Sequence, residues 1–169
     1  MVCQTRMQMG RIMPNRQLDE TDIRILRMLQ EDGRLTNVDL ADRVNLSASP
    51  CLRRTKRLED DGVIRGYRAD LDRVKLGLAL TVFVEIKVEK HNRENADALT
   101  AALRGMPEVV SCFMVSGQAD FIAELVVPDL AAYERVLSEK LLTLPMVTDI
   151  RSNFALRTIK TGGSLPIPD

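Results

Sequence analysis

The chain has 169 residues, 45% of them hydrophobic, and its 24 Lys and Arg residues balance its 24 Asp and Glu residues. This length and composition can form one large domain or two small ones with buried cores. The longest apolar run, LGLALTVFV, is too short to span a bilayer, so we expect no transmembrane helix. The neutral total hides an asymmetry: residues 1–75 carry 15 Lys and Arg against 12 Asp and Glu, and residues 76–169 carry 9 against 12.

The cysteines and the N-terminus both indicate a cytoplasmic protein. Cys3, Cys51 and Cys112 lie far apart and form no CxxC pair, which favours reduced thiols. Residues 1–17 show neither a signal-peptide core nor a helical stripe, so we expect a disordered extension without assigned function. Any of three methionines in it could be the biological start: Met7, Met9 or Met13.

Residues 36–62, TNVDLADRVNLSASPCLRRTKRLEDDG, are typical of two short helices joined by a tight turn. Thr36 can cap the first of these helices, and Asp39 completes a capping-box pattern. Asn45 suits the turn because asparagine enters the left-handed backbone region readily. A preceding helix is predicted to begin after Asp19. Together the three helices indicate a DNA-reading helix-turn-helix.

The second helix of the motif carries the candidate DNA contacts. On a helical wheel Cys51, Leu52, Thr55 and Leu58 share one side, which we predict faces the core. The remaining surface is polar or cationic, and arginine presents a donor fork that matches guanine or phosphate. A solvated basic face is the alternative for an isolated cluster, but the turn signature favours DNA. The DNA-binding residues predicted on this helix are Ser49, Pro50, Arg53, Arg54, Lys56 and Arg57.

The segment VIRGYRADLD follows Gly62 and is predicted to form a short hairpin-like wing. Its Arg65 and Arg68 would then lie along the phosphate backbone. A simple linker strand is the alternative interpretation of the same segment.

From Leu78 onward the periodicity changes to alternating strands and amphipathic helices. Strands are predicted over residues 82–88, 109–116, 121–127 and about 147–159, with a helix beginning at Asn92 and another after Asp129. The order βαββαβ is that of a ferredoxin-like domain, with both helices on one face of a four-stranded antiparallel sheet. The fold class is therefore α+β, a winged helix-turn-helix followed by this domain.

The other face of such a sheet is predicted to be a subunit interface, because its side chains are too apolar for solvent. A two-fold dimer would also present two recognition helices to two half-sites. The residues assigned to this face are Phe83, Val110, Cys112, Met114, Ile122, Val126 and Phe154.

Catalysis is not indicated by any motif in the sequence. The only histidine, His91, has no Ser, Cys or carboxylate partner at a recognisable spacing, and it suits a solvated loop. Phosphate loops, dinucleotide-binding glycine fingerprints and metal-ligand clusters are also missing from the sequence. We therefore expect neither enzymatic activity nor a cofactor. A ligand-independent architectural DNA-binding protein is the alternative, since it would share the basic helix and the oligomer.

With these motifs the chain resembles the leucine-responsive regulator/AsnC (Lrp/AsnC, feast/famine) family of bacterial and archaeal transcription regulators. The resemblance covers about Leu18 to Lys160 and rests on three segments: LDETDIRILRMLQEDGR, NLSASPCLRRTKRLEDDGVIRGY and MVSGQADFIAELVVPDLAAYERVL. It implies dimers that assemble into higher rings or octamers, with amino-acid effectors bound between dimers.

The family's effector site, carried over residue by residue, falls on the second hairpin and the last strand. Exposed turn N–H groups there can bind an α-carboxylate, and Asp120 can bind an ammonium group. The alternative is that Gly117 only makes the hairpin and Asp120 only caps it. Ala119 stands where the family often has an aromatic residue. The residues implied are Met114, Val115, Ser116, Gly117, Gln118, Ala119, Asp120 and Ser152.

These observations predict an amino-acid-responsive transcriptional regulator of amino-acid metabolism, with leucine as one possible effector. It would bind double-stranded DNA as a homodimer or octamer in the cytoplasm, associated with the nucleoid. The predicted divisions are an extension (1–17), a DNA-binding domain (18–62), a wing and linker (63–77), an effector and oligomerisation domain (78–160) and a tail (161–169).

Overall fold

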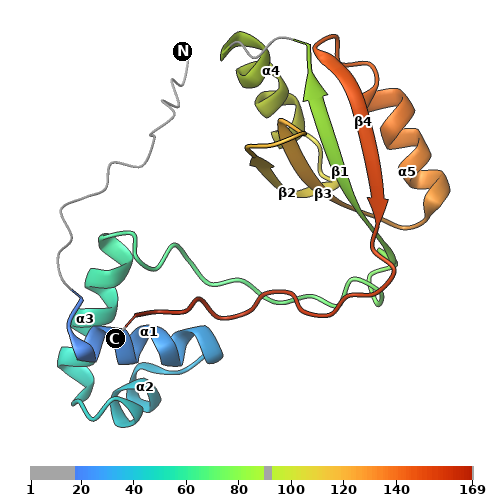
Figure 1. Ribbon diagram of the computed structural model, residues 1–169. Helices are drawn as coiled ribbons and strands as arrows, with labels where there is room; N and C mark the ends of the chain where they lie inside the picture. Colours follow the sequence, from blue (N-terminus) through green and yellow to red (C-terminus); the bar gives the residue numbers. More distant parts are fainter. Residues whose placement is uncertain (1–17, 90–92, 169) are drawn as a thin grey trace, which may run out of the picture. The chain divides into compact units, whose positions relative to one another are not determined.

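A computed structural model describes residues 18–89 and 93–168 (Figure 1). The predicted N-terminal extension and His91 lie outside these ranges. The chain divides into two compact units: the first extends to Ala69 and also includes the tail from Gly162, and the second comprises Asp70–Thr161. No helix in the described ranges is long and apolar enough to cross a membrane.

The first unit is a three-helix bundle of α1 (Glu20–Glu31), α2 (Asn37–Arg43) and α3 (Ala48–Asp60). Asp19 and Asp22 form a reciprocal capping box at the start of α1, and the Thr36 side chain accepts the Asp39 N–H at the start of α2. Asn45 has the left-handed φ of 56° that the turn requires. The core consists of Ile25, Leu26, Leu40, Ala41, Val44, Cys51 and Leu58.

The segment after α3 differs from the predicted hairpin. Residues 61–79 contain no strand, so the part that carries Arg65 and Arg68 is an extended connection. It is anchored near its start because the Ile64 N–H donates to the Leu58 carbonyl at 3.0 Å. Further along, the Tyr67 hydroxyl donates to the Glu59 carboxylate, also at 3.0 Å. Side-chain and backbone contacts with α3 therefore replace the expected cross-strand pairing.

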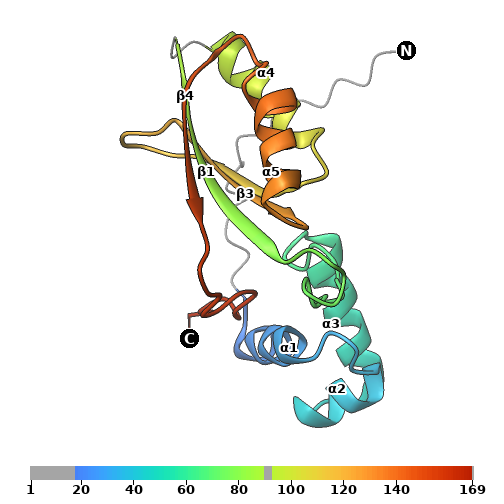
Figure 2. The same ribbon diagram turned by 90° about the vertical axis from the view of Figure 1, so that its right-hand side faces the viewer.

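The second unit confirms the predicted βαββαβ order. Its elements are β1 (Leu80–Val88), α4 (Arg93–Arg104), β2 (Val109–Met114), β3 (Phe121–Val127), α5 (Leu130–Val136) with a π-helical turn (Leu137–Leu141), and β4 (Val147–Phe154). The four strands lie in the order β2-β3-β1-β4 and all pairs are antiparallel. Figure 2 shows α4 and α5 covering one face of the sheet. The last strand ends at Phe154, before the predicted Ile159.

Register determines which side chains face the helices. The alternate residues Val82, Val84 and Ile86 of β1 are fully buried, and they pair with Leu125, Ala123 and Phe121 of β3. Directly paired residues of antiparallel strands point to the same face, so these pairs form the core beneath the helices. The opposite face, called here the open face, carries the intervening residues, including Phe83, Phe113, Ile122 and Val126.

The predicted membership of the open face was partly wrong. Cys112 and Met114 pair with Ala123 and Phe121, and Phe154 pairs with Val82, so all three share the helix-covered face. A register shift between Val109 and Ser111 inverts the alternation of β2. Such a bulge moves each later residue to the other face, which places Phe113 on the open face instead.

Candidate nucleic-acid interface and effector loop

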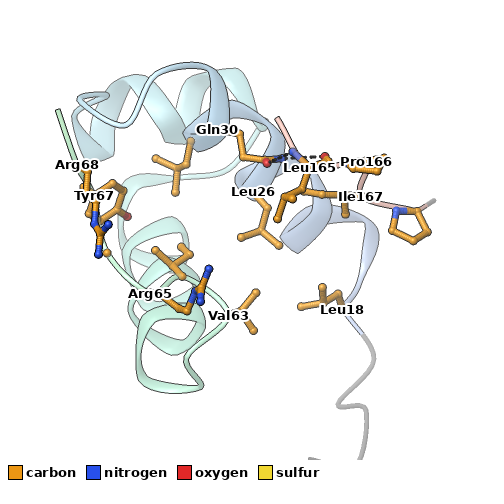
Figure 3. A pocket seen from close by; sticks show the side chains of 14 residues that line it. Leu18, Leu26, Gln30, Val63, Arg65, Tyr67, Arg68, Leu165, Pro166 and Ile167 are labelled. Atoms are coloured by element: carbon orange, nitrogen blue, oxygen red, sulfur yellow. Dashed lines mark hydrogen bonds between the residues drawn. The ribbon is translucent and has the colours of Figure 1, made fainter. Parts of the chain in front are cut away.

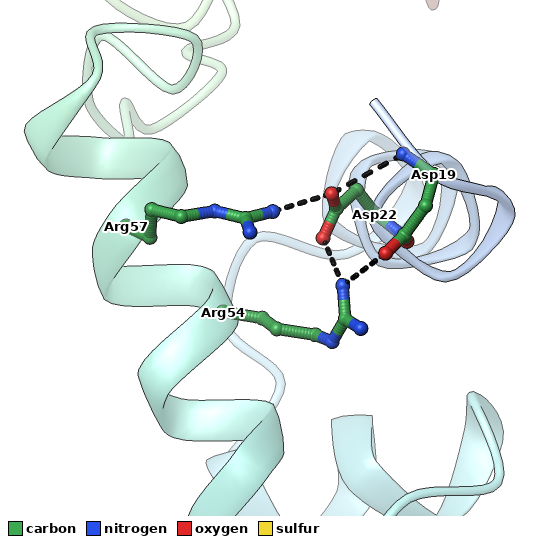
Figure 4. Close-up of polar contacts among 4 residues, drawn as sticks. All are labelled: Asp19, Asp22, Arg54 and Arg57. Carbon is green, nitrogen blue, oxygen red and sulfur yellow. Dashed lines mark hydrogen bonds and ion pairs between the residues drawn. The ribbon is translucent and has the colours of Figure 1, made fainter. Parts of the chain in front are cut away.

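A buried carboxylate joins the first and third helices of the bundle. Asp22 lies in the first turn of α1 and is only 1% exposed. The Arg54 guanidinium, from the middle of α3, binds Asp22 Oδ1 at 2.8 Å and Asp19 Oδ2 at 2.6 Å. One turn further along α3, Arg57 binds the other oxygen of Asp22 (Figure 4). Both oxygens of the buried carboxylate are therefore paired with cations.

The carboxylates and the guanidinium groups of this cluster stabilise each other's charged forms. The pKa of Asp19 is lowered, first because the Asp22 backbone N–H donates to its carboxylate and then because Arg54 does. The hydrogen bonds that Arg54 donates to the carboxylates of Asp19 and then Asp22 raise the pKa of Arg54. A carboxylate as buried as Asp22 is tolerated only when it is paired. Arg54 and Arg57 thus hold α3 against α1, a role that the sequence prediction of DNA contacts did not include.

The structure divides α3 into two stripes at helical spacing. Residues 51, 54, 55 and 58 face the bundle, and residues 49, 52, 53 and 56 face away from it. Ser49, Arg53 and Lys56 are exposed as predicted, whereas Pro50 is half-buried. Leu52 was predicted to lie in the core but is 56% exposed. Arg54 lies on the side of α3 that faces the bundle, because its guanidinium pairs there with the buried carboxylate of Asp22.

Two further cations were predicted to contact phosphate. Arg65 and Arg68 are exposed on the extended segment that follows α3. Gly66 lies between them with a φ of 142°, a conformation that favours glycine. The backbone here is therefore set by Gly66 and by the contact of Tyr67 with Glu59, without a strand pair.

The predicted effector loop is the connection between β2 and β3, which projects beyond the sheet in Figure 2. Ser116, Gly117 and Gln118 are exposed at its tip, and Gly117 has a φ of 138°. Ala119 is only 7% exposed, so the small residue at this position fills space inside the unit.

Asp120 fastens the loop to the sheet. Its Oδ2 accepts the Val88 N–H at 2.9 Å, its own N–H donates to the Ile86 carbonyl, and its carbonyl accepts the Val115 N–H. These contacts give Asp120 the capping role that the sequence left open.

The remaining two candidates lie on different strands of the same sheet. Met114 ends β2 and is 64% exposed, whereas Ser152 lies on β4 and contacts the Tyr133 hydroxyl. Since β2 and β4 are the two edges of the sheet, one chain does not bring Ser152 to the β2–β3 loop.

A helix-turn-helix with an exposed polar stripe, joined to a ferredoxin-like unit, defines a two-domain DNA-binding regulator. The winged helix-turn-helix DNA-binding family matches residues 18–65, and the Lrp/AsnC ligand binding domain matches residues 81–165. The chain belongs to the Lrp/AsnC family of transcriptional regulators. The predicted family, fold class and regulatory function are thus confirmed, and the relatives are regulators, not enzymes.

Named relatives span nearly the whole chain. The Bkd operon transcriptional regulator of Pseudomonas aeruginosa is 41% identical over 89% of this chain and 99% of its own length. The leucine-responsive regulatory protein of Salmonella typhimurium is 41% identical over 91% and 94%. Among solved structures, a Neisseria meningitidis transcriptional regulator in complex with L-Met has a TM-score of 0.85 at 42% identity, covering 89% and 97%.

The Asp22 cluster makes a prediction about stability. We expect Asp22→Asn to lower the free energy of unfolding by about 2 kcal/mol, because it removes the charge that pairs with both arginines. The loss stays below that of a fully buried pair because Arg54 and Arg57 are partly exposed and can rehydrate. Asp39→Asn is the control, because among the described residues the exposed Asp39 carboxylate accepts only the Thr36 hydroxyl at the start of α2, and it should cost less than about 1 kcal/mol. Equal losses in urea denaturation would contradict this assignment.

Proposed function

We propose that this regulator reads base edges with the outward stripe of α3, and that Arg54 and Arg57 serve mainly to hold that helix in place. The observation that carries the proposal is the division of the four cations of α3. Two are paired with the carboxylates of α1, and Arg53 and Lys56 are exposed on the stripe that faces away from the bundle. A recognition helix needs exposed donors on one face and a fixed attachment on the other.

Leu52 adds an apolar contact to this stripe. It lies between Ser49 and Lys56 at helical spacing, and more than half of its surface is exposed. An apolar side chain in the major groove contacts the C5-methyl group of thymine. The proposed stripe therefore offers a hydroxyl, an apolar side chain and the Arg53 cation to base edges, and Lys56 at its flank is proposed to contact phosphate.

We further propose that two chains pair through the open face of the sheet, and that these dimers assemble into octamers in the cytoplasm. Phe83 and Phe113 lie on this face and are 42% and 63% exposed. Large exposed aromatic side chains on one sheet face are typical of a subunit interface. Pairing would also place two recognition helices on one DNA site.

For the ligand we propose a free amino acid of the leucine or methionine kind, bound at the β2–β3 loop at a junction between subunits. Exposed backbone at Ser116–Gln118 offers N–H groups to an α-carboxylate, and Met114 offers adaptable apolar surface. Ser152 could join this site only from a neighbouring subunit. A solved relative from Neisseria meningitidis holds L-Met, which supports an amino acid as the ligand class.

A thermal-shift panel of the twenty amino acids tests the sensing part of this proposal. A ligand that binds only the folded protein raises its stability by RT ln(1 + [L]/Kd). We expect a rise in melting temperature with at least one apolar amino acid, and a change in gel-shift affinity for DNA with the same ligand. A panel without any hit would favour the architectural alternative.

Arg53→Ala tests base reading. We expect a loss of about 1 to 3 kcal/mol on the preferred DNA sequence, with relaxed preference at one base pair, because a bidentate contact to guanine is removed. Binding to a pool of randomised duplexes, followed by sequencing, measures both quantities. A uniform loss on preferred and random DNA would reassign Arg53 to phosphate.

Asp120→Asn separates the two roles of that carboxylate. Asparagine keeps an oxygen that can accept the Val88 N–H but loses the charge that would attract an ammonium group. We expect the fold to be retained and the Kd of the best amino-acid ligand, measured by calorimetry, to rise about tenfold. An unchanged Kd with an intact fold would show that Asp120 is only a cap and that the ammonium partner lies elsewhere.

Phe113→Glu tests the open face as the dimer interface. Burying a charge there should raise the dimer dissociation constant at least about 100-fold, which analytical ultracentrifugation can detect. Met114→Glu is the matched control, because the adjacent residue points to the other face and should leave the dimer intact. If the two variants behave alike, or Phe113→Glu keeps the parent mass, the interface lies elsewhere.

A further inference from the structure

The C-terminal tail is packed against the three-helix unit, although DNA reading and effector binding give it no role. Ile167 is half-buried and packs against the hydrophobic core of the bundle. It lies thirteen residues after β4 ends at Phe154. The tail residues 165–168 form one wall of a groove of about 800 Å³, and Leu18, α1 and residues 63–68 form the rest of its lining. Its apolar wall is formed by Leu18, Leu26, Leu29, Val63 and Ile64 (Figure 3).

Polar side chains of α1 bind the main chain of the tail. The Leu165 N–H donates to Gln30 Oε1 at 2.6 Å, and Gln30 Nε2 donates back to the Leu165 carbonyl at 3.3 Å. A side-chain amide that pairs with both groups of one residue imitates a neighbouring β-strand. Arg27 donates to the Ile167 carbonyl at 3.2 Å, so alternate residues of the tail are held.

The sequence of the tail suits this mode of binding. Pro166 and Pro168 flank the apolar anchor Ile167, and each fixes its own φ and lacks a backbone donor. An extended segment that is already stiff loses little entropy when it binds. The hydrogen bonds fall on Leu165 and Ile167, the residues that alternate with the prolines.

We propose that the surface formed by α1 and residues 63–68 is a peptide-binding site whose occupant is the chain's own tail, Leu165–Pro168, which forms the remaining wall of the groove. The tail is tethered to the same chain, so its local concentration is in the millimolar range, and weak contacts are sufficient to keep it bound. The unit that contains the helix-turn-helix is therefore completed by the last residues of the chain.

Docking of the tail also bears on the cations beyond α3. Arg65 and Arg68 line the same groove, so the bound tail restrains the segment that carries them. This consequence rests on the DNA-binding role proposed above. The docking itself does not, and it is tested below without DNA.

A labelled peptide tests whether the groove exists and is occupied. A fluorescein-labelled GGSLPIPD peptide, the sequence of residues 162–169, is titrated into the full chain and into a chain that ends at Thr161. We expect saturable fluorescence anisotropy with the shortened chain and at least tenfold weaker binding to the full chain, whose own tail competes. Equal binding to both chains, or no binding to the shortened chain, would overturn the proposal.

Two substitutions in the full chain give the same test without truncation. Ile167→Asp replaces the half-buried apolar anchor with a charge and should free the site for the labelled peptide. Leu165→Asp is the matched control, because this side chain is 72% exposed and only its backbone is bound, so the groove should stay closed. A groove that stays closed in Ile167→Asp, or opens equally in Leu165→Asp, would contradict the proposed anchor.

Cross-linking shows whether the tail belongs to the same chain. Arg68→Cys, on the other side of the groove lining, and Leu165→Cys are combined in a chain in which Cys3 and Cys112 are replaced by serine, and a bis-maleimide is added; the Gln30 and Arg27 contacts to the tail are kept. A one-chain product on a denaturing gel is expected from docking within the chain. A two-chain product would overturn this part and show that tails are exchanged between copies.

Discussion

The pairing of Asp22 with Arg54 and Arg57 is the interaction on which the DNA-binding unit depends. It satisfies a carboxylate that would be too costly to bury alone, and it fixes the rotation of α3 about its own axis. That rotation decides which residues of α3 are exposed. With Arg54 turned inward, Leu52 and Arg53 are turned outward, so one buried charge determines the chemistry of the outer surface.

In the second unit the corresponding constraint is strand register. One face of the sheet is buried beneath α4 and α5, which commits every second residue of β1 and β3 to the core. The bulge near the start of β2 then decides that Phe113 and not Met114 reaches the open face. The proposed dimer interface therefore follows from a shift of one residue in an edge strand.

The elements could be predicted from sequence because their signals are local. Caps at Asp19 and Thr36, the left-handed Asn45 and the alternation along β1 all act within a few residues. What could not be predicted depends on contacts distant in sequence. Arg54 has the pattern of a DNA-binding residue until Asp22, 32 positions away, is placed beside it. Asp120 has the pattern of an ammonium ligand, but in the structure its carboxylate accepts the Val88 N–H. No sequence pattern in the tail predicted that Leu165 would bind Gln30.

The salt dependence of DNA binding tests the division of α3 most directly. Each phosphate contact contributes about 0.9 to the slope of log K against log salt concentration. We predict that Lys56→Gln lowers the magnitude of the slope by about 1. Arg54→Gln and Arg57→Gln should leave it unchanged, because in the parent chain these two cations pair with Asp22 and not with phosphate. A reduction of about 1 in the Arg54→Gln slope would contradict the account, since it would mean that this arginine binds phosphate and not the buried carboxylate.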